Sequence, residues 1–515
     1  MLLSKLFGKR MKDVPSDATL ISHIFLLRGG YIKSVGSGIY SLLTPAVKIK
    51  RKIENIIRDE MEKLGGQEIS VPLVLPSNLW ERSGRFASVG KELLRFKDRS
   101  GKNMLLSMTH EEPVVDLAES FAKSYADYPF MLYQIQTKFR DEPRARGGLI
   151  RLREFTMKDA YSFHLTEKDL KNYYLKVLDS YHRIFNRVGL PEVISIESDS
   201  GMMGGSVAHE FMLLCDSGED SVVVCENCSY KANMEVADSL LPISPSNEGI
   251  KAYEYKEKDT KASVIVFIRA DLFVNETKLQ KLLCKEVSEI KVSDVKNVGD
   301  FLNSKGIGSN KCKLFYDSSL SKTSDSNVFY NLYKVKEGHI CPKCGSKLLI
   351  KRGIEVGNIF QLGTKYTKGM NVTYINDENK VGYAIMGCYG IGVTRLIASL
   401  IESHHDRFGP IWPKNVAPWQ IHICALDFED EAVRTKALKV YDVFSESFDV
   451  ILDDRSLSAG SKFADADLLG VPIRIIVSKK NAGTDLLELK FRGSKESQNL
   501  NLKGCKDLID NFYKD

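Results

Sequence analysis

The segment from Thr137 to Asp159 constrains the fold of this chain more than any other part of the sequence. Residues 130–142 and 152–163 have the length and composition of two strands, and the stretch between them is basic and contains glycine. The pattern therefore predicts an antiparallel hairpin with a long tip. Arg140 and Glu142 are two positions apart, so on a strand both side chains point to the same face.

This pairing of side chains suits a nucleotide. An arginine fork binds a carboxylate or a phosphate through paired hydrogen bonds, and a neighbouring carboxylate accepts from an adenine amino group. The chain has no glycine–lysine phosphate loop, so an arginine-lined antiparallel sheet would have to hold ATP. Arg144, Arg146 and Arg151 add positive charge at the tip. On the residues alone, a charged and solvated hairpin face explains the pattern equally well.

A long amphipathic helix is expected upstream of the hairpin, from Thr44 to Leu64. Thr44 suits the N-cap, Pro45 suits the first helical position, and Gly65 ends the helix. A strand-like run, 67–75, follows and is interrupted by Pro72, which favours an edge or an interface.

Further elements follow in the second half of the chain. Strand character returns at residues 350–364 and 381–385, and Arg395 is expected on a helix that begins after a glycine-rich run. From about residue 417, short apolar strands alternate with helices, which predicts a separate α/β domain. The length of 515 residues also exceeds one ordinary core. We expect a catalytic domain in two parts, an insert and a C-terminal domain, with the bounds 1–228, 229–340, 341–416 and 417–515.

The composition of the whole chain limits its possible partners and its location. The net charge of +6 permits a nucleic-acid partner but does not require one. No window of about 18 uninterrupted apolar residues is present, so no membrane span is expected. The N-terminus lacks a long apolar core and a small-residue cleavage site, and ten scattered cysteines suit a reducing compartment, so we expect a cytoplasmic protein.

Three segments resemble the signature motifs of class II aminoacyl-tRNA synthetases, and they occur in the expected order. The helix with Gly65 and Pro72 resembles motif 1, which builds the dimer interface in that class. Phe139–Glu142, followed by Arg151 and Phe155, resembles motif 2, and Gly387–Arg395 resembles motif 3. The resemblance implies an α/β (α+β) fold, with an antiparallel-sheet catalytic domain, an inserted domain and a C-terminal α/β anticodon-binding domain.

Within that class, the chain is most similar to the prolyl enzymes of bacterial type, over nearly its whole length outside the insert. The runs that carry this similarity are Thr109–Glu112, Gln134–Arg140, Met157–His164, Lys351–Gly357, Phe360–Lys365 and Asp453–Arg455. The resemblance implies a homodimer that takes ATP, Mg²⁺, proline and tRNA(Pro), with no membrane partner.

The resemblance also assigns roles to single residues. Thr109 and Glu111 would hold the proline imino group, and His164 and Cys388 would line the proline pocket, although ordinary packing remains the alternative for these last two. Arg140 would bridge the proline carboxylate and the α-phosphate as a catalytic residue. For ATP, the resemblance places Glu142 at the adenine amino group and Phe155 under the adenine ring. The triphosphate would be held by Arg151, the backbone of Leu152 and the catalytic Arg395, together with Arg140. Gln361 and Thr364 would also contact ATP, with Gln361 near Mg²⁺.

Two Cys-x-x-Cys pairs flank the insert, and their spacing is typical of a metal site. Four thiolates from Cys225, Cys228, Cys341 and Cys344 suit a closed, structural zinc site. A site that has lost its metal and plain buried cysteines are the alternatives.

The insert resembles the proofreading domain of bacterial prolyl enzymes only in part. That domain removes alanine wrongly attached to proline tRNA, because a proline pocket cannot strongly exclude a smaller side chain. Asp271 and Asn275 match the family pattern, whereas Ala270 and Leu272 replace its glycine and histidine. The glycine-rich loop is reduced to Lys305–Ser309. We therefore expect weak or absent editing.

The C-terminal domain resembles the anticodon-binding domain shared by several class II enzymes. Arg455 and Lys462 lie where relatives contact the anticodon, and Arg144 and Arg146 at the hairpin tip are further candidates for tRNA contact. A charged surface loop is the alternative for each of these residues.

Two other functions are alternatives to a prolyl-tRNA synthetase. A threonyl enzyme has a similar architecture, but it holds zinc in the active site itself, whereas the cysteines here frame the insert. A non-catalytic paralogue that binds tRNA has no need of an ATP site, which the retention of Arg140, Glu142 and Arg395 argues against.

Overall fold

The structure is a computed structural model that describes residues 1–16, 18–205, 207–242, 249–305, 312–320 and 328–514. By its internal contacts the chain forms two units, which are described separately. Unit 1 comprises Met1–Val193, Met202–Ser206 and Val356–Asp515, and unit 2 comprises Ile194–Gly201 and Val207–Glu355. No helix in the described part of the chain has the length and apolarity to cross a membrane.

A sheet that is antiparallel except for the parallel pairing of β3 with β7 forms the centre of unit 1, in the strand order β18–β21–β8–β7–β3. Its strands are β3 (Gly66–Glu68), β7 (Phe130–Phe139), β8 (Glu154–His164), β21 (Ile385–Gly392) and the part of β18 (Leu348–Gly363) that belongs to this unit. Strands β7 and β8 pair antiparallel, with Lys138 opposite Phe155, which confirms the predicted hairpin. Strand β21 continues the sheet, and Cys388 lies opposite Tyr161 of β8.

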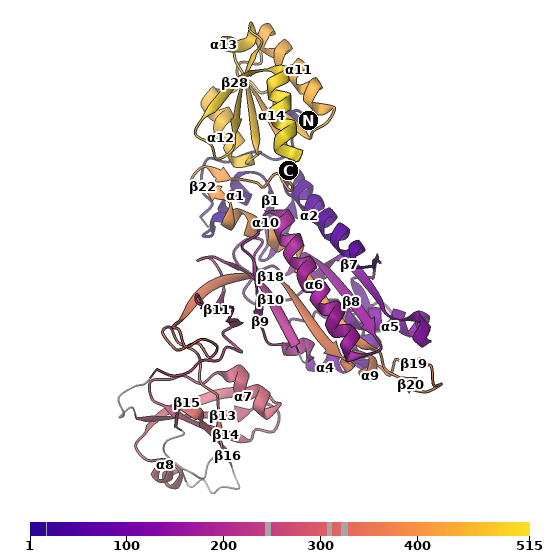
Figure 1. Cartoon of the computed structure of the whole chain (residues 1–515), viewed down its shortest axis with the longest axis vertical. Helices are drawn as coiled ribbons and strands as arrows, with labels where there is room; N and C mark the ends of the chain where they lie inside the picture. Colours follow the sequence, from indigo (N-terminus) through magenta and orange to yellow (C-terminus); the bar gives the residue numbers. More distant parts are fainter. Residues whose placement is uncertain (17, 206, 243–248, 306–311, 321–327, 515) are drawn as a thin grey trace. The chain divides into compact units, whose positions relative to one another are not determined.

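Helices α2 (Thr44–Lys63), α6 (Glu167–Val188) and α10 (Val393–Ser403) pack in this unit, with α6 lying along β8 and β21 (Figure 1). Tyr174 and Tyr181 of α6 are buried, as is Tyr389 on β21. The helix predicted from Thr44 is confirmed, but its N-cap is Leu43 and no side chain caps it. Pro45, in the first turn, needs no amide hydrogen bond, so the helix begins without a polar cap.

The strand expected at residues 67–75 is only partly present. The chain pairs as β3 beside β7, leaves the sheet, and pairs again as β4 (Val74–Pro76) with β6 (Asn103–Leu106). Pro72 lies in the unpaired stretch between them, where its missing amide hydrogen costs nothing. The remaining elements of the first part of unit 1 are α1 (Ile21–Arg28), β1 (Ile32–Gly36), β2 (Ile39–Leu42), α3 (Ser77–Arg82), α4 (Arg85–Ser88), β5 (Arg95–Lys97) and α5 (Glu111–Phe121).

The C-terminal part of unit 1 is an α/β domain with the strand order β25–β24–β26–β27–β28. The first three of these strands are parallel and confirm the predicted apolar runs. The strands and helices are β24 (Ile421–Ala425), α11 (Glu431–Ser445), β25 (Val450–Asp453), α12 (Ala459–Leu469), β26 (Ile473–Val477), α13 (Lys479–Ala482), β27 (Leu486–Phe491), β28 (Ser497–Asn501) and α14 (Leu502–Lys514). Shorter elements of unit 1 are α9 (Lys365–Gly369), β19 (Tyr374–Ile375), β20 (Val381–Gly382), β22 (His405–Asp406) and β23 (Gly409–Pro410).

The first residues of the chain lie on the edge of this C-terminal sheet. Leu2 forms a parallel bridge with Leu452 of β25, and the Leu452 amide donates to the Met1 carbonyl at 2.9 Å. Leu3 and Leu6 then join a buried cluster with Trp419, Ile451, Leu469 and Val471. The N-terminal segment thus completes the packing of a domain more than 400 residues away in sequence.

Unit 2 contains the strands β9 (Ile194–Glu197), β10 (Val207–Leu214), β11 (Asp220–Cys225) and β12 (Lys231–Asn233), and the first residues of β18 pair with β11. A second sheet in this unit follows the order β15–β13–β14–β16–β17. Its elements are β13 (Ile250–Glu257), β14 (Ser263–Arg269), α7 (Glu276–Leu283), β15 (Val287–Val295), α8 (Val298–Ser304), β16 (Cys312–Asp317) and β17 (Phe329–Tyr330). This sheet lies within the insert and has a core of its own around Val264, Val266 and Ile268.

Candidate active site and cysteine cluster

Arg140 follows directly after β7, at the end of the hairpin strand. Its Nε and Nη2 atoms both donate to the Met108 carbonyl at 3.3 Å, and the guanidinium lies 5.2 Å from the centre of the Phe155 ring. The structure therefore brings together Arg140 and Phe155, two of the residues expected around ATP. The side chain of Phe155 is half-buried, so part of the ring remains available to another flat group.

Glu142 and Arg151 lie on opposite sides of the hairpin tip and form an ion pair, with Arg151 Nη2 at 2.9 Å from Glu142 Oε1. Arg153 Nε also donates to the Glu142 carbonyl at 2.9 Å. Arg144 and Arg146 are exposed at the tip. The tip thus presents a carboxylate that pairs with Arg151, on a backbone that Arg153 also holds.

Arg395, near the start of helix α10, contacts the same tip. Its Nε donates to the Ile150 carbonyl at 2.8 Å. Leu152, whose backbone was expected at the triphosphate, has a buried side chain that anchors this part of the loop. Arg395 and Arg151 therefore belong to one cluster around the hairpin, although they are far apart in sequence.

Thr109, Glu111 and Cys388 converge beside the hairpin and are all buried. Thr109 Oγ1 donates to the carboxylate of Glu111 at 2.7–2.8 Å, and Cys388 Sγ donates to Glu111 Oε1 at 3.3 Å. Burial, reinforced by the charge of Glu111, raises the pKa of the Cys388 thiol well above its usual value, so the sulfur stays protonated. The arrangement is a carboxylate with two neutral donors around it, which suits an ammonium or imino group.

Sequence reasoning missed Arg85, which completes this site. Its Nη1 lies 3.2 Å from Glu111 Oε2 and 3.1 Å from Glu112 Oε1, and its guanidinium lies over the rings of Trp80 and Tyr366 at 4.6 and 5.4 Å. The arginine side chain is only 5% exposed. The adjacent buried carboxylates of the 109–112 run signal that a cation is needed, but nothing in the sequence identifies which one.

His164 does not join this site. Successive side chains of a strand point to opposite faces, and Cys388 lies opposite Tyr161, so His164 belongs to the other face of β8. There its Nδ1 lies 2.7 Å from Asp169 and its Nε2 lies 2.9 Å from the Ser162 hydroxyl. These contacts correspond to the packing alternative, with His164 holding the start of α6 against the sheet.

Gln361 and Thr364 lie at the end of strand β18 and just beyond it. Gln361 pairs with Gly387 of β21, at an irregularity in the strand register, and is nearly buried. Thr364 precedes helix α9 and is half-buried. Gln361 therefore belongs to the same sheet as the hairpin, and Thr364 lies one residue beyond the end of its strand.

In the C-terminal domain, Arg455 and Lys462 are engaged by carboxylates and carbonyls. Arg455 forms paired hydrogen bonds with Asp453 at 2.7 and 2.8 Å and a third bond with Asp465 at 2.7 Å. Lys462 is fully buried, and its Nζ donates to the Ala425 carbonyl at 2.5 Å. A side chain without exposed surface has no access to an anticodon, so Lys462 does not fit the direct tRNA contact expected for it.

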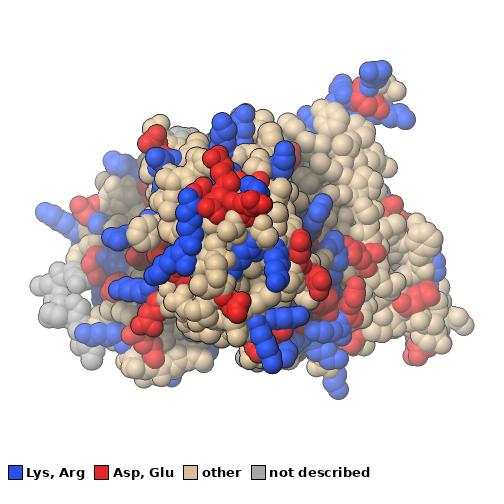
Figure 2. All heavy atoms as spheres, turned by 90° about the horizontal axis from the view of Figure 1, so that it is seen from above, with Lys and Arg blue, Asp and Glu red and all other residues tan. Residues whose placement is uncertain are grey.

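A surface hollow lies next to Arg455, at the carboxyl ends of the parallel strands. Its lining includes Leu426, Ser456, Ser458 and Lys479. Over the face seen in Figure 2, basic and acidic side chains are intermixed, and neither sign forms a continuous field. Charge alone therefore does not delimit a nucleic-acid surface on that face.

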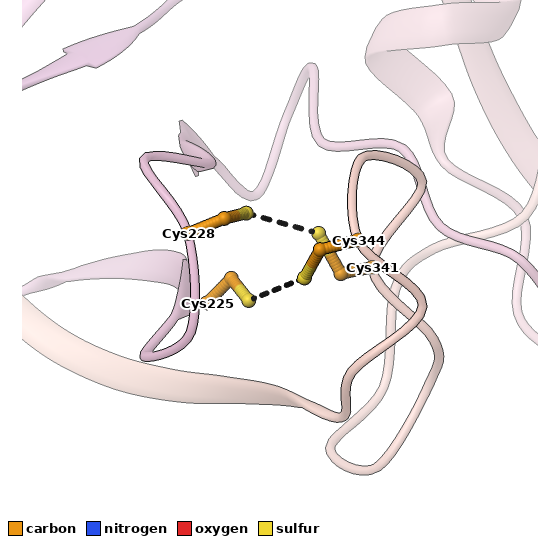
Figure 3. A group of neighbouring side chains, drawn as sticks. All are labelled: Cys225, Cys228, Cys341 and Cys344. Atoms are coloured by element: carbon orange, nitrogen blue, oxygen red, sulfur yellow. Dashed lines mark hydrogen bonds between the residues drawn. The ribbon is translucent and has the colours of Figure 1, made fainter.

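The four cysteines of the two Cys-x-x-Cys pairs gather in unit 2, with all four sulfur atoms within 4.8 Å of one another. Cys225 Sγ lies 3.5 Å from Cys344 Sγ, and Cys228 Sγ lies 3.6 Å from Cys341 Sγ (Figure 3). Four thiolates at about 2.3 Å from a tetrahedral zinc ion would be about 3.8 Å apart. The observed cluster is thus close to the size that a zinc ion requires.

The editing-like residues of the insert have local structural partners. Asp271 is paired with Arg269 at 2.6 and 2.9 Å, and Leu272 is fully buried in the core of the insert. Asn275 caps helix α7 by accepting from the Lys278 amide, and it donates to the carbonyls of Met234 and Glu235. Of the glycine-rich loop 305–309, only Lys305 lies within the described residues.

Comparison with known proteins gives the class of this chain. The model of the class II core domain of the G, H, P, S and T tRNA synthetases matches residues 94–404, and an anticodon-binding domain model matches residues 420–511. The fold and these matches define a class II aminoacyl-tRNA synthetase.

Relatives narrow the class to one family. A proline–tRNA ligase of Dehalococcoides mccartyi is 39% identical over 560 aligned positions, which cover 99% of this chain and 98% of the relative. A proline–tRNA ligase of Thermodesulfovibrio yellowstonii is 36% identical over 573 aligned positions, which cover 100% of this chain and 100% of the relative. The chain belongs to the proline–tRNA ligase family.

A solved structure shares the fold. Prolyl-tRNA synthetase from Cryptosporidium parvum, complexed with halofuginone and AMPPNP, superposes with a TM-score of 0.65 at 15% identity, covering 98% of this chain and 80% of that one. The alignments with the relatives are longer than the 515 residues of this chain, so the relatives carry segments that it lacks.

Proposed function

We propose that this chain activates proline with ATP and transfers it to tRNA(Pro). The observation that carries the proposal is the buried convergence of Thr109, Glu111 and Cys388 beside the arginine of the hairpin. The Glu111 carboxylate, which these two neutral donors and Arg85 hold in place, suits the proline imino group, and the nearby guanidinium of Arg140 suits the proline carboxylate. Family membership agrees with this substrate.

The chemistry needs positioning more than covalent help from the protein. The proline carboxylate attacks the α-phosphate of ATP in line and forms prolyl-adenylate, with release of pyrophosphate. A ribose hydroxyl of the terminal tRNA adenosine then attacks the acyl carbon, and AMP leaves. Arg140 and Arg395 stabilise the phosphate charge as it redistributes, at fixed positions that need no reorganisation.

The remaining ATP contacts follow from the hairpin. Glu142, held by Arg151, accepts from the adenine amino group, and Phe155 lies under the ring. Gln361 and Thr364 complete the site, with Gln361 near the magnesium ion that accompanies ATP. An amide oxygen is a hard donor, which is the ligand type that magnesium accepts.

Amino-acid-dependent exchange of pyrophosphate into ATP tests this function. We expect exchange with proline and none with threonine, and Arg140→Ala is expected to reduce it by at least about 100-fold because the transition-state charge loses a fixed partner. Exchange with threonine would favour a threonyl enzyme. An absence of exchange with any amino acid would favour a non-catalytic paralogue.

We also propose that the four cysteines bind a structural zinc ion. The match between the sulfur separations and a tetrahedral site supports it, and burial of two of the cysteines favours a closed site. Metal analysis of the purified protein should give one zinc per chain, and Cys228→Ser with Cys341→Ser should abolish it. The proposal would be contradicted if the purified full chain contained no zinc. It would also be contradicted if a chelator left the midpoint of unfolding unchanged.

We propose that editing of Ala-tRNA(Pro) is weak or absent. The structural engagement of Asp271, Leu272 and Asn275 supports this, because each is used within the insert itself. Incubation of the protein with Ala-tRNA(Pro) should release alanine no faster than buffer does. Robust deacylation would refute it.

The proposal also includes a homodimer, contacts with tRNA and a cytoplasmic location. A homodimer through the motif 1 region is supported by the exposure of Pro72 and Val74 in the single chain, because both side chains are apolar. Contact of Arg144, Arg146 and Arg455 with tRNA would use side chains around the hairpin tip and the C-terminal hollow. All ten cysteines are unbridged, which agrees with a cytoplasmic protein.

A further inference from the structure

A buried ion pair lies between the two hairpin strands, beneath the segment Thr109–Glu111. Lys138 Nζ on β7 is 2.6 Å from Asp159 Oδ1 on β8, and neither side chain has more than 3% of its surface exposed. Asp159 Oδ2 also accepts from Gln134 Nε2 at 3.0 Å and from the Tyr161 hydroxyl at 2.8 Å. Burying two charges costs solvation, and an apolar pair of similar size often gives equal or greater stability.

This ion pair contacts the segment through His110. Lys138 Nζ lies 2.7 Å from His110 Nδ1, and His110 Nε2 lies 3.1 Å from the Pro72 carbonyl. An ammonium group only donates, so Nδ1 accepts and Nε2 carries the hydrogen. The ring is therefore neutral and held in one tautomer, with a directional bond at each nitrogen. Burial, together with the charge of Lys138, lowers the pKa of His110 to about 4, in agreement with this assignment.

The backbone of the segment is held by the same network. The His110 amide donates to the Tyr161 hydroxyl at 3.0 Å, and that hydroxyl donates onward to Asp159. Tyr161 also lies opposite Cys388, so the hydroxyl is on the face of the sheet that carries the proposed proline pocket. Both the ring and the amide of the residue between Thr109 and Glu111 are thus tied to the hairpin.

We propose that Lys138, Asp159 and Tyr161 are positioning residues that set the geometry of Thr109 and Glu111 for proline. The inference rests on the proposed proline-binding role of those two side chains. None of the three residues needs to touch the substrate. Because the network is directional, an apolar replacement restores packing but not orientation, and displacement of a reacting group by about 1 Å is costly.

Lys158 provides a matched control, because it is a buried lysine next to Asp159 in sequence. Its side chain lies on the opposite face of β8, where Nζ contacts the Tyr181 hydroxyl at 2.6 Å and the Tyr389 carbonyl at 3.2 Å. Lys158→Met should lower stability without changing the KM for proline.

The test compares pyrophosphate exchange and urea unfolding in the full chain. Lys138→Met alone leaves a buried carboxylate without its cation and is expected to lower the urea midpoint. The double variant Lys138→Met with Asp159→Asn removes both charges and should recover the midpoint. Its KM for proline should nevertheless stay raised on the order of 10-fold, with the KM for ATP unchanged, because His110 has lost its donor. Tyr161→Phe should raise the KM for proline by a smaller factor.

The outcomes separate this inference from the function on which it rests. If the double variant regains both stability and the wild-type KM for proline, or if the KM values for ATP and proline rise together, the network is only structural. Glu111→Gln serves as the reference. If that substitution leaves the KM for proline unchanged, the proposed proline site itself is wrong.

Discussion

Two short segments resemble the same family, but they are used differently. In Thr109–Glu111, the carboxylate of Glu111 accepts from Thr109 and from Cys388 on a distant strand, and these three side chains form a buried polar cluster. In Asp271–Asn275, the side chains of Asp271, Leu272 and Asn275 are engaged within the insert, as an ion-pair partner, a core residue and a helix cap. A residue retained at a motif position therefore supports a function only when its partners come from the rest of a site.

The largest contrast is expected between two arginines that pair with acids in these regions. Arg85→Met leaves Glu111 and Glu112 buried without a cation, which costs about 3–5 kcal/mol, and should abolish proline-dependent exchange. Arg269→Met removes a partly exposed pair and should cost less than about 1 kcal/mol. Urea unfolding and exchange assays measure both. Equal costs would remove the distinction between the two regions.

Acid should weaken the first region through His110. Its folded pKa of about 4 lies below the value of about 6.5 in an unfolded chain, so the unfolded state binds more protons between these values. The contribution is complete above pH 6.5 and declines as the pH falls toward 4, by about 2 kcal/mol between pH 7 and 5. Comparison of wild type with His110→Gln isolates this part, and identical pH profiles would contradict it.

A smaller effect is expected from the helix cap in the insert. Asn275→Ala removes the bond to the Lys278 amide and should lower the stability of the insert by about 1 kcal/mol. Proline-dependent exchange should stay at the wild-type level, because Asn275 acts within unit 2. Asn275→Ser keeps a capping oxygen but loses the bonds to the Met234 and Glu235 carbonyls, so the difference between the serine and alanine variants isolates the cap. A loss of Ala-tRNA(Pro) deacylation in Asn275→Ala would mean that the residue belongs to a working site after all.

The smallest effect is expected for Asp271→Ala. Its partly exposed ion pair with Arg269 contributes little, so the free energy of unfolding should change by less than about 0.5 kcal/mol. Deacylation of Ala-tRNA(Pro) should remain at the background rate in both proteins. A measurable rate in wild type that this substitution abolishes would show that Asp271 belongs to a working hydrolytic site.

Much of the fold and part of the candidate site could be predicted from the periodicity of apolar residues and from motifs. The hairpin, the helix from Thr44 and the three parallel strands near the C-terminus follow from apolar spacing, which local sequence determines. The position of His164 could not, because its face relative to Cys388 depends on the pairing of strands more than 200 residues apart. The burial of Lys462 was missed for a related reason, since the resemblance supplies a position but not the side of α12 that faces the sheet. Arg85 carried no local signal, because only the fold brings it to the carboxylates.

The docking of Leu2, Leu3 and Leu6 on the C-terminal sheet bears on the order in which the chain is made. Leu3 and Leu6 are synthesised more than 400 residues before Trp419, Ile451 and Leu469, the residues that they cover. Until β25 has been synthesised, this segment lacks its partners, so the edge of β25 closes long after residues 2–6 have been made. Contacts of such sequence separation are slow to form. A fragment that begins at residue 417 would therefore expose this apolar surface and should be prone to aggregation when expressed alone.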